Sequence, residues 1–193
     1  MKAQRAAFLN ALAQHGHNHD QQATTRADKL LNITPDTGPF LTLLLKTARA
    51  RSVLEIGTSN GYSTIWLADA VEANEGHVTT VEASAAKVAL AHVNFAQAGV
   101  TALVTQVQAR AEQWLATCLE QYEFVFLDAD RAQYEALWPN LLRVLVPGGL
   151  LVVDNAESHQ AELVGFRALV DATPVVESVL VPIGKGELVI RKG

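Results

Sequence analysis

Residues 53–68 read VLEIGTSNGYSTIWLA, and this stretch decides the fold class. It opens with a short apolar run, which is typical of a strand covered on both faces. Gly57 and Gly61 then flank a polar turn, where glycine permits a tight bend and close approach of the backbone to a ligand. From Tyr62 the residue pattern predicts a helix to about Ala73. The stretch therefore predicts a strand–turn–helix unit of a parallel sheet.

Strand-like and helix-like segments alternate from this stretch to residue 192. Repeated units of this kind predict an α/β fold with a mostly parallel sheet and helices on both faces. We expect seven strands: 53–56, 78–82, 102–107, 124–128, 150–154 and two within 175–192 that form an antiparallel hairpin around Pro182–Gly186. The expected helices are 62–73, 85–98, 111–119, 134–144 and 161–172.

The N-terminal part is expected to be a helical extension, residues 1–50, of a single domain whose core is 51–193. The histidines of the segment HGHNHD lack a cysteine or carboxylate frame, so we interpret them as solvated side chains. Threonine and proline suit the first positions of a helix, which predicts a helix start at Thr34-Pro35. The expected helices are one ending before about residue 20, one over 24–31 and one from 34 to 49.

The composition excludes several classes of protein. Hydrophobic residues make up 49% of the 193 residues, which is enough for a core and unlike a disordered chain. The net charge of −5 does not attract phosphate backbones, so nucleic acid is not expected as a partner. Cys118 is the only cysteine and forms no internal disulfide. Because no signal sequence or membrane-spanning run is present, we expect a cytoplasmic protein without membrane contact.

Polar residues follow the first two predicted strands, where ligands bind in open parallel sheets. The glycines of the first turn are spaced G-x-x-x-G, and Glu82 ends the second strand 25 residues after Gly57. An acidic residue at that place can accept hydrogen bonds from both ribose hydroxyls of a nucleoside. The spacing differs from the G-x-G-x-x-G that seats a pyrophosphate, so S-adenosylmethionine (SAM) is favoured over a dinucleotide.

A second polar group follows two later strands. Asp128 and Asp130 come after FVFL, and Asp154 and Asn155 come after LLVV. Adjacent parallel strands would bring them to one cleft, where their oxygens suit a hard cation such as Mg²⁺. Such an ion could favour the deprotonated form of a bound hydroxyl. Helix capping or contacts with polar groups of the cofactor are the alternative reading of these carboxylates.

Taken in order, these motifs resemble a known family. VLEIGTSNGYSTIWLA (53–68), VTTVE (78–82), FVFLDADRAQY (124–134), PGGLLVVDN (147–155) and VPIGKGELVI (181–190) are similar to motifs of the cation-dependent O-methyltransferases of the catechol and caffeoyl-CoA type, especially their small bacterial members. The resemblance covers about residues 34–191. The glycine motif marks SAM methyltransferases in general, and the DAD and DN pair narrows the choice to this branch.

The resemblance implies a Rossmann-like SAM methyltransferase fold and specific residue roles. Ser63 would lie near the SAM carboxylate, Glu82 would hold the ribose, and Ala83 and Ala111 would border the adenine. The implied cofactor-binding residues are Glu55, Gly57, Gly61, Ser63, Glu82, Ala83, Ala111 and Asp128. The implied metal ligands are Asp128, Asp154 and Asn155, and the expected catalytic residues are Asp128 and Arg131.

Two features depart from the family pattern. Arg131 stands where relatives commonly have a lysine that acts as base, and arginine stays protonated. It could still stabilise an oxyanion or bind an acidic substrate, and the base would be a metal-bound water, Asp130 or His159. The segment after Asn155 is also shorter than usual and lacks a tryptophan often found there. These differences leave the acceptor and the metal dependence open.

We therefore carry three hypotheses. The first is an O-methyltransferase that uses SAM and a divalent cation, expected to be Mg²⁺ from the type of ligands, to methylate a hydroxyl of a small catechol-like or other aromatic acceptor. The second is a metal-independent SAM methyltransferase acting on another acceptor such as RNA or protein. The third is a non-catalytic module that binds SAM or a nicotinamide cofactor. Because members of the family often form dimers, a homodimer is an expected assembly.

Overall fold

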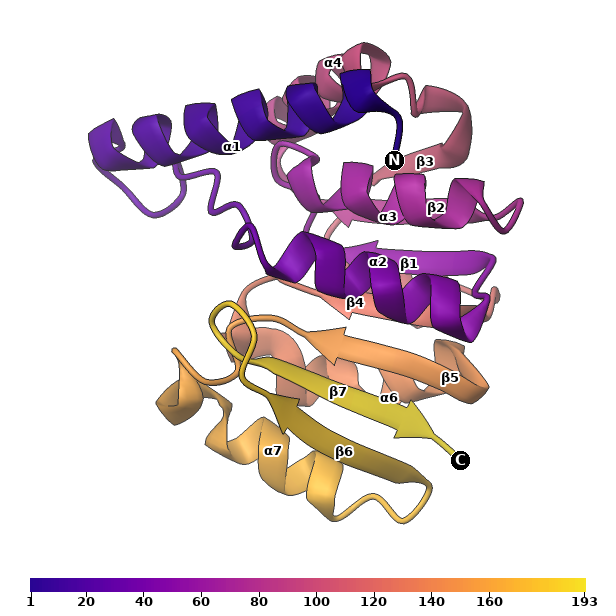
Figure 1. Ribbon diagram of the computed structural model, residues 1–193. Coiled ribbons are helices and arrows are strands. Elements are labelled where there is room, and N and C mark those ends of the chain that lie inside the picture. Colours follow the sequence, from indigo (N-terminus) through magenta and orange to yellow (C-terminus); the bar gives the residue numbers. More distant parts are fainter.

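The computed structural model describes residues 1–193, and its seven strands form one sheet in the order β3-β2-β1-β4-β5-β7-β6 (Figure 1). The first five strands are parallel, whereas β7 runs antiparallel to both β5 and β6. This architecture confirms the predicted fold class. The strands are β1 (Ser52–Ile56), β2 (His77–Glu82), β3 (Val104–Gln108), β4 (Tyr122–Leu127), β5 (Leu145–Val153), β6 (Val176–Val181) and β7 (Glu187–Lys192).

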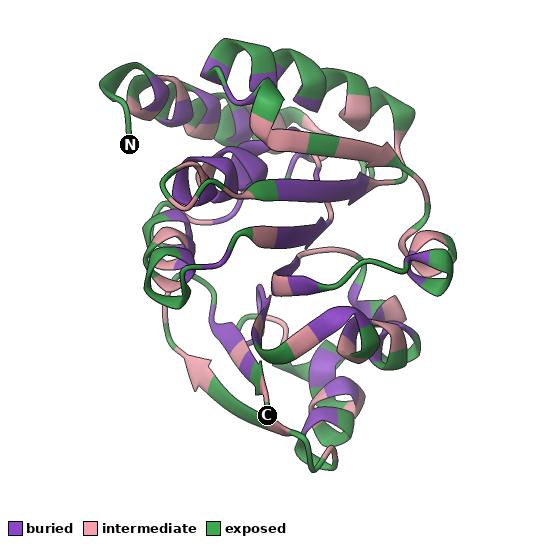
Figure 2. Ribbon diagram, turned by 90° about the vertical axis from the view of Figure 1, so that its right-hand side faces the viewer, coloured by how far each residue is buried: buried purple, intermediate pink, exposed green.

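Helices cover both faces of the sheet, and Figure 2 shows the buried strands between the two helical layers. Alternate strand residues point to opposite faces and enter two core clusters of similar size, 22 and 21 residues, so neither face is left open. One face packs against α1 (Ala3–Gln22), α2 (Thr37–Ala48), α3 (Tyr62–Glu72) and α4 (Ala85–Ala98), and the other against α5 (Ala111–Thr117), α6 (Tyr134–Val144) and α7 (Val164–Asp171). Short 3₁₀ turns lie at Thr101–Leu103, Arg131–Gln133 and Gln160–Leu163.

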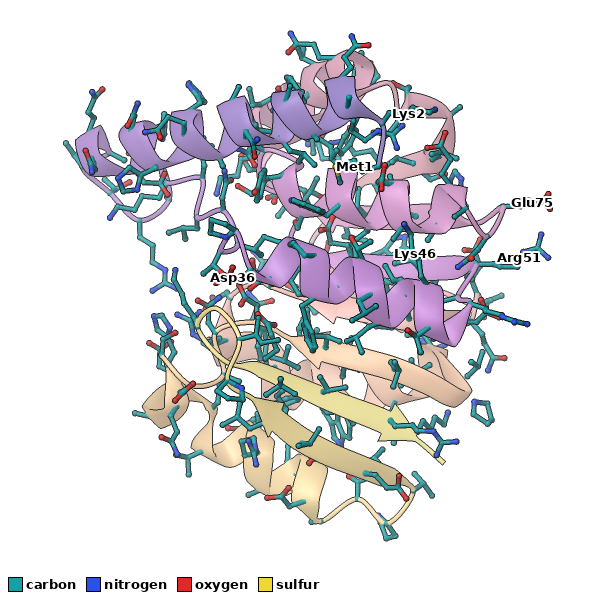
Figure 3. All side chains as sticks on the ribbon, in the orientation of Figure 1. Met1, Lys2, Asp36, Lys46, Arg51 and Glu75 are labelled. Carbon is teal, nitrogen blue, oxygen red and sulfur yellow. The ribbon has the colours of Figure 1, made fainter.

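Helix α1 is tied to α3 by ion pairs at its first turn. The buried guanidinium of Arg5 donates to Asp69 Oδ1 (2.7 Å) and Glu72 Oε2 (2.8 Å), and Lys2 also donates to Glu72. Met1 and Lys2 are labelled beside α3 in Figure 3. These contacts fix the N-terminal extension on the outside of the α3–α4 layer.

No helix in the structure combines the length and apolar character needed to cross a bilayer.

The helix predicted over 24–31 is wrong, because that segment consists of turns and bends. The Asp20 carboxylate accepts hydrogen bonds from the backbone N–H groups of Leu30 (2.7 Å) and Leu31 (2.8 Å), which folds the segment back onto the end of α1. Leu31 has a φ of 52°, a left-handed conformation that ends any helix. Residues 23–33 therefore form an irregular segment, here called the strap, that leads from α1 to α2.

Several other boundaries differ from the prediction. Helix α2 begins at Thr37 instead of Thr34-Pro35, because residues 34–37 form a turn in which the N–H of Thr37 donates to the carbonyl oxygen of Thr34 (3.1 Å). Strand β3 begins at Val104 instead of residue 102, because Thr101–Leu103 form a 3₁₀ turn. Helix α1 continues through the histidine-containing segment instead of stopping before it. Strand β5 begins at Leu145 and runs through Pro147-Gly148-Gly149, with a register irregularity against Tyr122 and Phe124 of β4. The predicted helix 161–172 is divided into a 3₁₀ turn and α7. In each case tertiary packing or pairing extends or breaks an element whose local sequence suggested another limit.

Gly57 ends β1 where the backbone of β4 leaves no room for a side chain. Its φ is +106°, and a Cβ built on it would lie 2.0 Å from the carbonyl oxygen of Asp128. Gly61 has a φ of +83°, and its Cβ would lie 2.5 Å from the ring of Phe95 in α4. The two glycines of the motif are thus required by close packing of the protein itself.

We predict that Gly57→Ala destabilises the fold by about 3 kcal/mol, because it combines a strained φ with a backbone clash. Gly99→Ala is the matched control, since Gly99 also has a positive φ (+66°) but no atom within 4 Å of its Cβ. It should cost only about 1 kcal/mol. Urea unfolding measures both values, and equal losses for the two variants would contradict the role of the β1–β4 contact.

Candidate functional site

A cavity of about 850 Å³ lies at the carboxyl ends of the parallel strands. In Figure 1 this edge of the sheet is on the left, below the end of α1 and beside the strap. The lining comes from the turns after β1, β2, β3, β4 and β5, from the strap, and from Lys185 between β6 and β7. The strand order reverses between β1 and β4, and such a switch point is where open α/β sheets bind ligands.

The predicted site residues divide into those that line this cavity and those that do not. Lining residues are Gly57, Ser63, Glu82, Ala83, Ala111, Asp128, Arg131 and Asn155, together with the alternative bases Asp130 and His159. Glu55, Gly61 and Asp154 are not among the lining residues. Direct contact of Glu55 or Gly61 with a cofactor is therefore not what the geometry supports; both act on the shape of the turn.

Glu82 is held in place by two backbone groups. Its Oε2 accepts a hydrogen bond from the N–H of Ser59 (3.0 Å), and its Oε1 accepts one from the N–H of Ser84 (2.8 Å). The carboxylate thereby joins the turn after β1 to the turn after β2. Each oxygen keeps acceptor capacity, since an ionised carboxylate has about four lone-pair sites. The neighbouring Ala83 has a small side chain that leaves space beside this carboxylate.

Glu55 is completely buried and supports the turn from behind. Its carboxylate accepts hydrogen bonds from the hydroxyls of Ser63 (2.6 Å), Thr80 (2.6 Å) and Thr64. Burial raises the pKa of Glu55 to about 7, and these hydroxyls oppose that rise. Ser63 lines the cavity while its hydroxyl is directed to Glu55, so Glu55 sets the position of a cavity residue.

The strap closes another side of the cavity, which the sequence analysis did not foresee because it assigned a helix there. Ser59 donates its hydroxyl hydrogen to the carbonyl oxygen of Leu30 (2.6 Å). Asp20 binds the N–H groups of Leu30 and Leu31. Hydrogen bonds therefore hold two backbone N–H groups and one carbonyl group of the strap. The available signal in the sequence was the acidic Asp20 ahead of a turn. A single carboxylate, however, does not indicate which backbone N–H groups it will bind.

The predicted acidic cluster does come together. Asn155 Nδ2 donates to Asp154 Oδ2 (2.7 Å) and lies 3.4 Å from Asp128 Oδ1. Asn155 has a φ of 63°, a strained conformation of the kind that collects at functional sites. Burial raises the pKa of Asp128 well above its usual range, and the charges of Asp154 and Glu55 add to the effect. Asp154 Oδ1 is buried and has no hydrogen-bond partner.

Glu187 joins this cluster and was missed by the sequence analysis. It is fully buried at the start of β7 and accepts a hydrogen bond from the Thr37 hydroxyl (2.9 Å). Burial, followed by the nearby Asp154, raises the pKa of Glu187 to about 9. Its Oε2 accepts no hydrogen bond, and in its protonated form Glu187 can donate one to Asp154. The signal in the sequence was one acidic residue opening the otherwise apolar run GELVI, which is unusual for an interior strand of a sheet.

Three polar side chains surround the acidic cluster on the cavity side. The Arg131 side chain is only 4% exposed, and its Nε donates to Glu162 Oε2 (2.7 Å). Asp130 is exposed and caps the turn 131–133 by accepting from the N–H of Ala132 (3.3 Å). Partial burial and nearby cations lower the pKa of His159, which favours its neutral form. His159 therefore has the protonation state needed to accept a proton.

No group of three His, Cys, Asp or Glu side chains, the acidic cluster with Glu187 included, has an arrangement that could hold a metal ion without further ligands. The predicted ligand set is of another kind, because it consists of the carboxylates of Asp128 and Asp154 and the amide of Asn155. Cys118 is buried and free.

The family model for O-methyltransferases matches residues 9–193. The chain belongs to the O-methyltransferase family. This confirms the resemblance seen in the sequence and extends it across the helical N-terminal part. The Rossmann-like fold of SAM O-methyltransferases is confirmed as well.

Individual members of the O-methyltransferase family show the same relationship. A catechol O-methyltransferase from Niastella koreensis is 36% identical over 129 residues, which are 65% of this chain and 58% of that protein. One from Mycobacterium tuberculosis is 37% identical over 144 residues, which are 70% of this chain and 65% of that protein. These matches span less than two thirds of either relative. A solved O-methyltransferase from Bacillus cereus in complex with SAH has a TM-score of 0.80 and 25% identity, covering 97% of this chain and 91% of that one.

We predict that Glu55 makes the stability of this family member depend on pH. Its pKa is about 7 in the folded state and near 4.5 when exposed, so the folded state binds more protons between these values. Stability is therefore lost as the pH rises from about 4.5 to about 7, by about 3 kcal/mol for this group.

Replacing the group tests this. Glu55→Gln should reduce the pH dependence of the free energy of unfolding. The variant should therefore become more stable relative to the unmodified protein as the pH increases. Urea unfolding between about pH 5 and pH 8 measures the slope. Glu75→Gln, at a carboxylate that is 90% exposed, should leave the slope unchanged. A slope unaltered by Glu55→Gln would contradict the assignment.

Proposed function

We propose that this protein transfers the methyl group of SAM to a hydroxyl of a small aromatic, catechol-like acceptor. The observation that carries the proposal is one cavity with two differently equipped ends. The fixed carboxylate of Glu82 faces one part of it, and Asp128 and Asn155 face another. The names of the related catechol O-methyltransferases support the acceptor class.

The turn residues would bind SAM. Each oxygen of Glu82 already accepts one backbone N–H and retains capacity for a ribose hydroxyl. Ala83 and Ala111 line the neighbouring wall with small side chains, which leaves space for the adenine ring. Gly57 and Ser63 would border the methionine part, with Glu55 and Gly61 shaping the turn behind them. The turn lacks the third glycine of a pyrophosphate site, so a nicotinamide dinucleotide fits less well.

The residues at the other end fit a divalent cation. Asp128, Asp154 and Asn155 would hold it, and the buried Asp154 Oδ1 without a partner is the acceptor that such an ion would satisfy. Burial disfavours the ionised forms of the surrounding carboxylates. A positive charge beside them would lower the free-energy cost of ionising them. A bound Mg²⁺ would lower the pKa of an acceptor hydroxyl and so favour the nucleophilic oxygen.

The protein's own residues would position the reactants and remove a proton. In the transfer, a bond forms between the acceptor oxygen and the methyl carbon while the carbon–sulfur bond breaks and SAH leaves. The hydroxyl proton must pass to a base, and Arg131 cannot accept it. His159, which is favoured in its neutral form, and the exposed Asp130 both line the cavity. Arg131 would instead contribute positive charge to the cavity wall beside the acidic cluster.

The metal-independent alternative uses the same cofactor site without the cation. The two readings differ in what chelation does, so the cofactor assignment and the metal assignment are tested separately. The homodimer expected from the resemblance stays a prediction, and a sedimentation experiment measures it.

We predict that SAH raises the melting temperature, because it binds only the folded state. Glu82→Gln should weaken SAH binding by about tenfold or more, since it removes charged hydrogen bonds to the ribose. Glu75→Gln is the control, because Glu75 is labelled at the opposite edge of the sheet in Figure 3. Calorimetric titration measures the dissociation constants. Absence of any SAH binding would overturn the proposed function.

We predict that Mg²⁺ increases methyl transfer to a catechol and that EDTA abolishes it. Asp154→Asn should weaken Mg²⁺ binding by about tenfold or more while SAH still binds, because one charged ligand is lost and the cofactor turn is untouched. Calorimetric titration with Mg²⁺ follows the first effect, and the SAH titration follows the second. Full activity in EDTA would move the assignment to the metal-independent reading.

A further inference from the structure

Basic side chains gather on the cavity side of the acidic cluster. Arg26 comes from the strap, Arg131 from the turn after β4, and Lys185 from the turn between β6 and β7, and all three line the cavity. They are far apart in sequence, so their convergence is a property of the fold. Their charges act together on His159, whose pKa is lowered first by partial burial and then by these three cations.

Arg131 differs from the other two because its side chain is buried. It is 4% exposed, and its Nε is used by Glu162. Its Nη2 is buried and has no hydrogen-bond partner. A buried guanidinium with a free donor is costly, since the group has lost water without replacing every hydrogen bond. The side chain therefore has donor capacity that nothing in the protein uses.

The acidic groups near this cluster do not use that capacity. Glu162 is about half exposed and binds only Nε, and Asp130 is directed to the backbone of its own turn. Asp128 is affected by the charges of Lys185 and Arg131, yet it makes no hydrogen bond with either. Arg26 is not needed to balance the charge of Asp128. It comes from the strap, and its charge acts on His159 and Glu162 instead.

We propose that Arg131, Lys185 and Arg26 form an anion subsite that binds an oxyanion of the acceptor, so that the enzyme prefers acceptors carrying both a hydroxyl and an acidic group. The inference rests on the proposed function. A guanidinium presents paired N–H donors that match a carboxylate or a phosphate, and lysine adds a flexible point charge. The shared chemistry is an oxyanion, and a carboxylate on the aromatic ring is its simplest form.

The subsite also explains how an acidic acceptor could approach the acidic cluster. Ionised carboxylates of the acidic cluster would repel a negatively charged molecule, whereas basic groups on the cavity side attract it and orient its other end. The acceptor would then lie with its anionic group toward Arg131 and Lys185. Such complementarity sets which end of a substrate faces which residues and excludes cationic analogues.

The test compares catechols that differ in one substituent of similar size: a carboxylate, a hydroxymethyl group, an aminomethyl group and a phosphate ester of the hydroxymethyl compound. We expect kcat/KM for the carboxylate or the phosphate compound to exceed that for the hydroxymethyl compound by about tenfold or more, with the aminomethyl compound lowest. The carboxylate and phosphate arms distinguish the two oxyanions.

Arg131→Gln and Lys185→Gln should lower the ratio of kcat/KM for the preferred anionic compound over the hydroxymethyl compound, mainly through KM. Arg51→Gln removes the same charge at an exposed arginine, which Figure 3 labels at the opposite edge of the sheet, and should leave the ratio unchanged. Arg131→Lys should restore part of the preference, because it returns the charge without the fork of donors.

A binding experiment separates this inference from the proposed function. Benzoate has no hydroxyl to methylate, so its calorimetric titration in the presence of SAH tests the anion subsite alone. Weaker benzoate binding in Arg131→Gln than in Arg51→Gln would support the subsite even if no catechol were methylated. Methylation of all four catechols with equal kcat/KM, or benzoate binding unaffected by Arg131→Gln, would overturn the inference and leave the proposed function standing.

Discussion

The contact between Gly57 and the backbone of Asp128 determines the rest of the site. It brings the ends of β1 and β4 so close that a Cβ would not fit, exactly at the point where the strand order reverses. The turn after β1 then leaves the sheet in one direction and the turn after β4 in the other, and the cavity opens between them. Both the Glu82 carboxylate and the acidic cluster take their places from this junction. The glycine is therefore a requirement of sheet packing before it is a feature of ligand binding.

Much of the fold follows from local pattern, because buried parallel strands are short apolar runs and the helices between them keep their own spacing. All seven strands occur where the pattern places them, although β3 and β5 begin at other residues, and the helices Ala85–Ala98 and Tyr134–Val144 have the predicted bounds. The strap could not be predicted, since its conformation depends on Asp20 reaching residues ten and eleven positions away. Glu187 was missed for a similar reason: its burial beside Asp154 depends on how β7 pairs with β5, which local sequence does not specify.

Charge is arranged in layers around the cavity. Carboxylates that burial favours in their neutral forms, Asp128 and Glu187, lie in or behind the cavity wall, and arginine and lysine side chains line the cavity itself. Because electrostatic effects are stronger where water is excluded, each layer has more influence on a bound molecule than the same residues would have on an open surface. The net charge of −5 conceals this separation, so the overall composition says little about which molecules the site attracts.

The pairing of β7 with β5 has a consequence for how the chain can change in evolution. Leu188 is paired with Val153, so Glu187 stands opposite Asp154 and on the same face of the sheet. One inserted or deleted residue in the turn 182–186 that shifted this pairing would turn Glu187 to the other face and move Lys185 away from the cavity. Surface turns usually tolerate changes in length. Here the length of the turn is constrained, and homologues that keep Glu187 should also keep the spacing of PIGKG.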